Sequence, residues 1–291
     1  MAVYLNDIPV VTSRFPNNEV QLVNVHQTIL KSFREDIPRR IAILLRWESN
    51  EDLLVLQLVR LAILDIPTMK NTYCYLDIPF FPYGQMDRAY HDKMFSLKYV
   101  AHIINSLQFD EVRITDPHST VLPALINRCV CHYPMLYKAV SEVYYGRADI
   151  LMFPDEGALK KYGHIMNDES RLFLLKTSMD DLSVIHGSKT RTTQATSSSI
   201  SSYNLVMPDP DFVRGKKVVM VDDMVIGGRT FVEAAKALRD AGATHITLCV
   251  THMMARAKQF YNSKGDGLID EIISDDTLNM IPWFEMNDPR P

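Results

Sequence analysis

The chain has 291 residues, of which 47% are hydrophobic and 23% are charged, and its formal net charge is −4. The length predicts two domains, and the composition is typical of a soluble globular protein. The acidic balance argues against nucleic-acid binding, which usually requires a basic excess. The longest apolar run, residues 41–45, is far shorter than the roughly 20 residues of a membrane-spanning helix. The N-terminus also lacks the pattern of a signal peptide, so we expect a cytoplasmic protein.

Four cysteines are present, and their spacing is irregular: Cys74, Cys129, Cys131 and Cys249. We expect them to be reduced thiols, as is usual in the cytoplasm. The cluster Cys129-Val130-Cys131-His132 could indicate a zinc site, but no second ligand pair follows at a suitable spacing. We therefore interpret this cluster as packing residues.

From Tyr73 onward, short apolar runs alternate with helix-like segments, which is the pattern of a parallel sheet flanked by helices. Ser96 is expected to cap a helix whose apolar positions recur every three or four residues. Strands are predicted at residues 112–114, 150–153, 218–221 and 246–250.

Polar residues follow the first three of these strands: Asp116-Pro117-His118, Pro154-Asp155-Glu156-Gly157 and Asp222-Asp223. In open parallel sheets, ligands bind beyond the carboxyl ends of the strands, so these clusters can belong to one cleft.

Two further segments flank the third cluster. Thr230 and Glu233 predict a capping box at the start of the next helix, and Gly242 is placed to end that helix. The stretch from Gly187 to Asn204 is rich in Ser and Thr and poor in apolar residues. Its composition favours a linker, and the alternative is a mobile flap over an active site.

The segment Val221-Asp222-Asp223-Met224-Val225-Ile226-Gly227-Gly228-Arg229-Thr230 combines two binding tools. Its carboxylates can bind sugar hydroxyls, and the amides of a glycine turn at a helix start can bind phosphate. Spacing alone leaves open an exposed acidic turn without function. The order of strand, Asp-Asp, short loop, Gly, Thr and helix resembles the phosphoribosyl-pyrophosphate loop of the type I phosphoribosyltransferase fold.

Five other segments resemble motifs of the phosphoribosyl pyrophosphate synthetase family, and they occur in the family's order along nearly the whole chain. Residues 78–88 are similar to its Pro-Tyr-Ala-Arg-Gln-Asp-Arg segment, and Asp116-Pro117-His118 is similar to its Asp-Leu-His. Pro154-Asp155-Glu156-Gly157 resembles its Pro-Asp-Ala-Gly. Residues 15–19 resemble its Phe-x-Asn-x-Glu, and residues 184–191 resemble its Ile-His-Lys-x-Arg. The Phe-x-Asn-x-Glu segment contributes an adenine pocket across a subunit contact in that family, and the transferases lack it.

This resemblance implies an α/β fold of two phosphoribosyltransferase-type parallel-sheet domains related by pseudo-duplication. We place the domains at residues 1–144 and 145–291, with the boundary near Tyr144 and the active site between them. The adenine-pocket segment serves a neighbouring subunit in the family, which implies a homodimer or a larger homo-oligomer.

The resemblance also implies an activity. An Mg-ATP-dependent diphosphokinase would transfer the β,γ-diphosphate of ATP to the anomeric hydroxyl of a ribose 5-phosphate group and release AMP. His118 and Asp155 would hold Mg²⁺, while Lys189 and Arg191 would close over the β-phosphate in the transition state. The implied ATP-binding residues are Phe15, Asn17, Glu19, Gln85, Asp87 and Arg88. The implied acceptor-binding residues are Asp222, Asp223, Gly227, Gly228, Arg229 and Thr230.

The acceptor loop departs from the family pattern Asp-Asp-x-x-Asp-Thr-Gly-Gly-Thr. Ile226 replaces an acid, Gly227 replaces a threonine and Arg229 replaces a glycine. In the ATP segment, Gln85-Met86 replaces Arg-Gln. Arg binds phosphate as a planar fork, so a larger 5-substituted acceptor such as ADP-ribose is expected, giving ADP-ribose pyrophosphate in nucleotide and NAD salvage.

Two alternatives stay open. One is ordinary phosphoribosyl pyrophosphate synthesis from ribose 5-phosphate. The other is a catalytically silent, nucleotide-binding regulatory relative. The metal-site and flap residues favour an enzyme, because a silent protein has no physical need of them.

Overall fold

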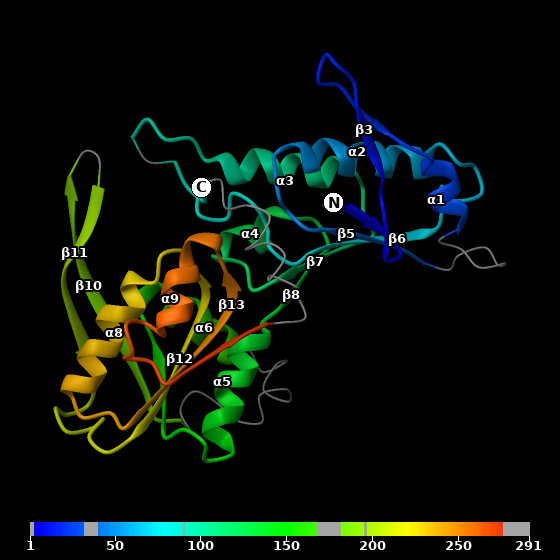
Figure 1. Ribbon diagram of the computed structural model, residues 1–291. Helices are drawn as coiled ribbons and strands as arrows, with labels where there is room; N and C mark the ends of the chain where they lie inside the picture. The colour runs from blue at the N-terminus through cyan, green and yellow to red at the C-terminus, as the bar shows by residue number, and fades with distance from the viewer. Residues whose placement is uncertain (1–2, 32–39, 90, 168–181, 195–196, 276–291) are drawn as a thin grey trace. The chain divides into compact units, whose positions relative to one another are not determined.

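The computed structural model describes residues 3–31, 40–89, 91–167, 182–194 and 197–275. The chain divides into two compact units, Met1–His132 and Tyr133–Pro291. Each unit contains a six-stranded sheet in which most neighbours are parallel (Figure 1). The predicted α/β class with one parallel-rich sheet in each half is therefore confirmed. The predicted boundary near Tyr144 lies at the end of a helix of the second unit, and the division into residues 1–144 and 145–291 stays a prediction.

The first unit contains, in chain order, β1 (Val3–Leu5), β2 (Ile8–Pro9), β3 (Thr12–Arg14), β4 (Val20–Leu22), α1 (Val25–Lys31), β5 (Arg40–Leu45), α2 (Glu51–Leu64), β6 (Tyr73–Ile78), α3 (Ser96–Ser106), β7 (Glu111–Thr115), α4 (Val121–Leu125) and β8 (Cys129–His132). The sheet order is β2-β1-β5-β6-β7-β8. Strands β5 to β8 are parallel, whereas β1 pairs antiparallel with β2 and β5. Strands β3 and β4 form a separate antiparallel hairpin.

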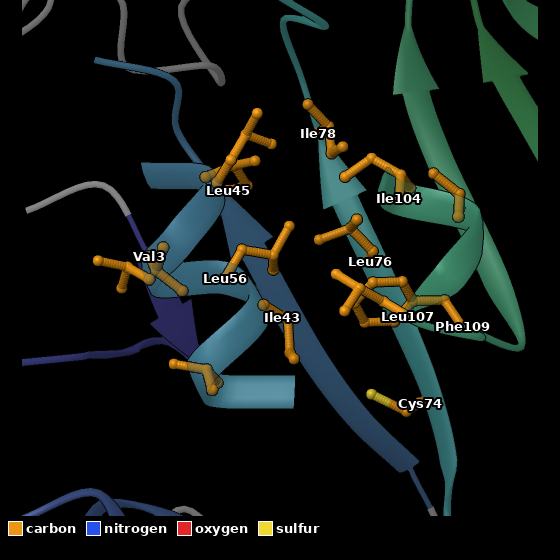
Figure 2. Close-up of a cluster of buried hydrophobic side chains, with 14 of the residues drawn as sticks. Val3, Ile43, Leu45, Leu56, Cys74, Leu76, Ile78, Ile104, Leu107 and Phe109 are labelled. Atoms are coloured by element: carbon orange, nitrogen blue, oxygen red, sulfur yellow. The ribbon is translucent and has the colours of Figure 1, made fainter. Parts of the chain in front are cut away.

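A compact hydrophobic core supports this sheet. Successive strand residues point to opposite faces, so alternate residues of β5 and β6 are buried. Figure 2 shows Ile43 and Leu76 of these strands among the same side chains as Leu56 of α2 and Ile104 of α3. All four are at most 1% exposed. This packing fixes the carboxyl ends of β6 and β7, from which two polar loops leave the sheet.

The second unit contains α5 (Pro134–Tyr144), β9 (Ile150–Phe153), α6 (Glu156–Met166), β10 (Val184–Gln194), β11 (Ser197–Val206), β12 (Lys217–Val225), α8 (Arg229–Asp240), β13 (His245–Met253), the 3-10 turn η2 (Ala255–Ala257), α9 (Lys258–Ser263) and β14 (Glu271–Ser274). The sheet order is β11-β10-β9-β12-β13-β14, and only β10 and β11 pair antiparallel. All four residues of β9 are buried, as expected for a central parallel strand covered on both faces. Among the described helices, we find none that combines the length and apolar character needed to cross a membrane.

The Ser- and Thr-rich stretch from Gly187 to Asn204 lies in the β10–β11 hairpin. Strand β10 pairs with β9 only over residues 184–186, and the rest of the hairpin extends beyond the sheet (Figure 1). The interpretation of this stretch as a linker is therefore wrong. The β-branched threonines favour a strand, and the two strands pair their backbone groups with each other.

Two predicted helix starts are corrected by the structure. Ser96 is the first helical residue of α3, and Phe95 precedes it without a side-chain cap. Helix α8 begins at Arg229 after Gly228, again without a side-chain cap, so Thr230 does not form the predicted capping box. The predicted end at Gly242 is confirmed, because its φ of +91° follows the last turn of α8.

Candidate functional site

In the first unit, the loops that follow β6 and β7 meet. A Cβ atom added to Gly84 would lie 3.4 Å from the Cβ of His118. Asp87 is buried and accepts a hydrogen bond from Nε of Arg88 at 3.0 Å. Burial acts to raise the pKa of Asp87, but hydrogen bonds from Arg88 and Ser119 and the charge of His118 lower it below its ordinary value. The loops therefore place an ionised carboxylate beside the predicted metal ligand His118.

The other predicted ATP-binding residues of this unit are exposed. Gln85 lies in the turn between β6 and α3. Phe15, Asn17 and Glu19 lie at the tip of the β3–β4 hairpin, where the amide of Phe15 donates to the carbonyl of Glu19 at 2.9 Å. Phe15 exposes 48% of its surface, which leaves an aromatic ring accessible at the tip. The structure thus divides the predicted ATP-binding residues between the loop after β6 and the tip of the β3–β4 hairpin of the first unit.

In the second unit, Asp155 occupies the turn between β9 and α6. Its backbone is extended, and Oδ1 accepts a hydrogen bond from the amide of Ala158 at 2.9 Å, so Asp155 caps α6. Its other carboxylate oxygen, Oδ2, forms an ion pair with Nζ of Lys189 on β10. The side chain of Arg191 lies outside the described part of the structure. Two of the predicted catalytic residues, one from the turn and one from the hairpin, are therefore in direct contact.

The protonation state of Asp155 follows from these partners. Burial acts to raise its pKa, but the Lys189 ammonium and the amides of Ala158 and Gly157 together lower the pKa below its ordinary value. Asp155 is therefore a carboxylate at neutral pH. A carboxylate at this position has the charge and the oxygen ligands that a magnesium ion prefers.

The two acids of the acceptor segment lie within a strand rather than after it. The predicted end of the third strand at Val221 is wrong, because β12 continues to Val225 and Asp222 pairs with Val250 of β13. Asp223 is buried, and its Oδ1 lies 3.1 Å from Nζ of Lys161. The strand pairing and this ion pair hold the acids in place.

Asp222 differs from Asp223 in its electrostatic surroundings. Burial raises the pKa of Asp222 well above its ordinary value, and the negative charges of Asp223 and Asp155 act in the same direction. The ammonium of Lys161 acts the opposite way but does not outweigh them. A pair of acids that resists full ionisation can both donate and accept hydrogen bonds, as sugar hydroxyls require.

The loop from β12 into α8 completes this group. Gly228 has a φ of +77°, and a Cβ atom there would lie 2.2 Å from the Phe260 ring, so only glycine fits. Ile226 and Gly227 are exposed, and Arg229 is exposed at the first position of α8. Thr230 follows as a half-buried residue. Backbone amides and a guanidinium at a helix start are suited to an anionic ligand.

Sequence reasoning missed two residues of the second unit. Lys161 is a lysine on the buried face of α6, together with Ala158 and Ile165, and its place in that apolar pattern was the available signal. Tyr203 is the single aromatic residue between Gly187 and Asn204. Its hydroxyl donates a hydrogen bond to the carbonyl of Pro154 at 2.8 Å.

The protein ligands could bind magnesium only together with substrate phosphates and water. Within the described residues, no cluster of three or more His, Cys, Asp or Glu side chains could hold a metal ion. Mg²⁺ normally keeps several waters and binds substrate phosphates with one or two carboxylates. Asp155 of the second unit can supply such a carboxylate. The thiols Cys129 and Cys131 instead pack against the core of the first unit.

The chain is similar in sequence to proteins of known function. The family model "Phosphoribosyl transferase domain" matches residues 170–282. The ribose-phosphate pyrophosphokinase of Methanothermobacter thermautotrophicus is 24% identical over 271 residues, covering 93% of this chain and 85% of the relative. That of Corynebacterium efficiens is 26% identical over 210 residues, covering 69% of this chain and 58% of the relative. The match thus spans less than two thirds of the length of the second relative.

A solved structure supports the same relationship at the level of the fold. The phosphoribosylpyrophosphate synthetase from Mycobacterium smegmatis superimposes with a TM-score of 0.58 at 16% sequence identity, covering 94% of this chain and 90% of that structure. The domain model, the curated relatives and the shared fold agree. The chain is therefore similar in sequence to ribose-phosphate pyrophosphokinases, and it shares the fold of a phosphoribosylpyrophosphate synthetase.

Proposed function

We propose that this protein is an Mg-ATP-dependent diphosphokinase of the ribose-phosphate pyrophosphokinase type. It transfers the β,γ-diphosphate of ATP to the anomeric hydroxyl of a ribose 5-phosphate group and releases AMP. The observation that carries the proposal is the ion pair between Asp155 and Lys189 at the end of β9. It brings together an ionised oxygen ligand and a cation, which are the two groups that transfer of a charged diphosphate requires.

We assign a separate role in this reaction to each of the proposed site residues. Bound magnesium would neutralise charge on the ATP phosphates, and Asp155 with His118 would hold it. Lys189 carries a positive charge that can stabilise the diphosphate as its charge redistributes. Asp222 and Asp223 would bind the ribose hydroxyls of the acceptor, and the pairing of β12 with β13 and the ion pair of Asp223 with Lys161 support their position.

We propose further that the acceptor carries a group on its 5-phosphate, as ADP-ribose does. Ile226 offers no hydrogen bond to a small phosphate, and it exposes 39% of its surface. A Cβ atom added to Gly227 would meet nothing within 4 Å, which leaves space at this point of the loop. Arg229, exposed beside it, can bind a bridging diphosphate through its planar fork. The product would be ADP-ribose pyrophosphate, and the reaction would serve nucleotide and NAD salvage in the cytoplasm.

The test compares ADP-ribose with ribose 5-phosphate as acceptors of the full chain with Mg-ATP, and follows AMP and the product mass. A charged hydrogen bond contributes about 1.5–3 kcal/mol, so we expect kcat/KM to be at least about tenfold higher for ADP-ribose. Arg229→Ala should reduce this preference. Lys236→Ala, at an exposed position further along α8, should leave it unchanged.

Each other outcome selects an alternative. A clear preference for ribose 5-phosphate would make the protein an ordinary phosphoribosyl pyrophosphate synthetase. Absence of magnesium-dependent AMP release with either acceptor would favour a silent regulatory relative. The exposed ring of Phe15 at the β3–β4 tip supports our further proposal of a homodimer or larger homo-oligomer, in which this tip contacts a neighbouring copy.

A further inference from the structure

Tyr203 joins the β10–β11 hairpin to the turn between β9 and α6. It lies on β11 opposite Lys189 of β10. Its hydroxyl donates to the buried carbonyl of Pro154 at 2.8 Å. Burial raises the pKa of Tyr203 well above its ordinary value, and the negative charges of Asp155 and Asp222 raise it further. The hydroxyl therefore keeps its proton at neutral pH and remains a donor.

Gly187 permits this contact because it has no side chain. A Cβ atom at Gly187 would lie 1.9 Å from Oη of Tyr203, 2.4 Å from its Cζ and 2.5 Å from the carbonyl oxygen of Pro154. No side chain can occupy that space without moving the ring or the turn. The tyrosine hydroxyl thus occupies the space that a side chain at position 187 would need.

The same contact lies next to the groups that carry the proposed chemistry. Pro154 directly precedes Asp155, and Gly187 lies two positions before Lys189. The family motif that this segment resembles places its lysine directly after the histidine, whereas here Gly187 and Ser188 separate His186 from Lys189. Each of these two extra residues contacts either the turn after β9 or Tyr203, which packs on that turn. Gly187 is in contact with Tyr203, and the hydroxyl of Ser188 donates to Oε1 of Glu156 at 3.1 Å.

We propose that Tyr203 is a positioning residue: its hydrogen bond to Pro154 fixes the turn that presents Asp155 against the strand that presents Lys189. Tyr203 acts through these neighbours rather than on a substrate. Its kinetic effect rests on the proposed function, but its effect on the turn does not.

The physical reason is that β10 is paired with β9 only as far as His186. Beyond that residue, the position of Lys189 depends on contacts such as the Tyr203–Pro154 hydrogen bond. Without the hydroxyl, the buried carbonyl of Pro154 would lose its donor, and the turn would shift toward another partner. A displacement of about 1 Å at a reacting group can lower the rate about 10²-fold, so a partial loss of position is expected to be measurable.

The test compares Tyr203→Phe with Tyr261→Phe, a control at an exposed tyrosine of α9. We expect Tyr203→Phe to lower kcat about tenfold, which corresponds to about 1.4 kcal/mol. The acceptor KM should change by less than about threefold, because the substitution does not alter the Asp222–Asp223 pair. Tyr261→Phe should change neither constant.

Two readouts do not depend on turnover. The first is Mn²⁺ binding in the presence of an ATP analogue with a non-cleavable α,β bond, and we expect Tyr203→Phe to weaken it about threefold to fivefold. The second is hydrogen exchange at the amides of Ala158 and Leu159, which depend on the Asp155 turn. Their exchange should be faster in Tyr203→Phe than in the wild type. Gly187→Ala, which pushes the ring away, should accelerate exchange at the same amides.

The outcomes separate the positioning role from the function. Unchanged Mn²⁺ binding and unchanged exchange in Tyr203→Phe would overturn the positioning role, whatever the activity. Faster exchange throughout the second unit would also overturn it, because it would indicate a general loss of stability. If exchange in Tyr203→Phe is faster only at the start of α6 and the wild-type protein releases no AMP, the positioning role is supported and the proposed function is overturned.

Discussion

At position 222, a half-buried acid lies beside a second acid, Asp223, and the ammonium of Lys161 acts against their charges. The folded protein therefore favours the protonated form of Asp222. A folded-state pKa above the unfolded value contributes stability below the unfolded pKa, and this contribution is lost as the pH rises through the folded pKa. At neutral pH, ionisation of Asp222 destabilises the folded protein. Such a loss of stability is common at functional sites.

This imbalance predicts that Asp222→Asn stabilises the protein while impairing acceptor binding. Each unit of pKa shift corresponds to about 1.4 kcal/mol, so we expect the free energy of unfolding at pH 8 to rise by about 1 kcal/mol or more. The gain should shrink at pH 4, near the unfolded pKa. Urea denaturation at both pH values measures it, and Asp7→Asn, at an exposed turn position, is the control. Equal effects at the two pH values would contradict the prediction.

The residues of the site differ in how far the sequence predicts them. Asp155, Lys189 and the acid pair lie in motifs of recognisable order. Tyr203 and Lys161 do not, because their roles arise from contacts between distant segments. The Tyr203–Pro154 hydrogen bond spans 49 residues of sequence, and no local pattern indicates such a contact.

At the scale of the element, the turn from β12 into α8 depends on Gly228. Its φ of +77° and the Phe260 ring at 2.2 Å from an added Cβ both exclude a side chain. The left-handed conformation costs an alanine roughly 1–2 kcal/mol, and overpacking costs typically 1–3 kcal/mol. We expect Gly228→Ala to lower the free energy of unfolding by about 2–4 kcal/mol and to raise acceptor KM.

Gly227 provides the matched control one residue earlier. It is exposed, and an added Cβ would meet nothing within 4 Å. Gly227→Ala should therefore change stability by less than about 0.5 kcal/mol. Guanidinium denaturation of both variants measures the difference, and similar losses in the two would show that the turn does not depend on Gly228.

The elements themselves were predictable where local patterns decide them. The apolar run at residues 150–153 corresponds to β9 at both ends, because Asp149 precedes it and Pro154 follows it. The end of β12 was not predictable, since Asp222 and Asp223 suggest a loop but are held in the strand by pairing to β13. The hairpin of β10 and β11 was also missed, because this stretch is rich in Ser and poor in apolar residues, whereas its strands form by pairing with each other.

At the scale of the whole molecule, the proposed catalytic residues are divided between two compact units. His118, with Asp87 beside it, belongs to the first unit, whereas Asp155 and Lys189 belong to the second. The family resemblance assigns residues from both units to one Mg-ATP. If that assignment is right, His118 and Asp155 act on the same ion, and changes to the two should not have independent effects on the rate.

We therefore predict that His118→Ala and Asp155→Asn are strongly non-additive. Each single variant should lower the rate of AMP release by about 10²–10³-fold, as loss of a charge-stabilising group does in other enzymes. The double variant should be about as slow as the slower single variant. Loss of one ligand already removes most of the metal's contribution to the rate, so loss of the second ligand has little further effect. Circular dichroism checks that all three proteins remain folded.

The control for this cycle is His102→Ala, at an exposed histidine of α3 in the first unit. Combined with Asp155→Asn, it should leave the rate of the Asp155 variant unchanged, which shows that coupling is specific to His118. If the effects of His118→Ala and Asp155→Asn instead multiply, the two residues serve separate steps or separate sites. In that case the shared metal assignment is wrong, and Asp155 with Lys189 must act on the diphosphate without His118.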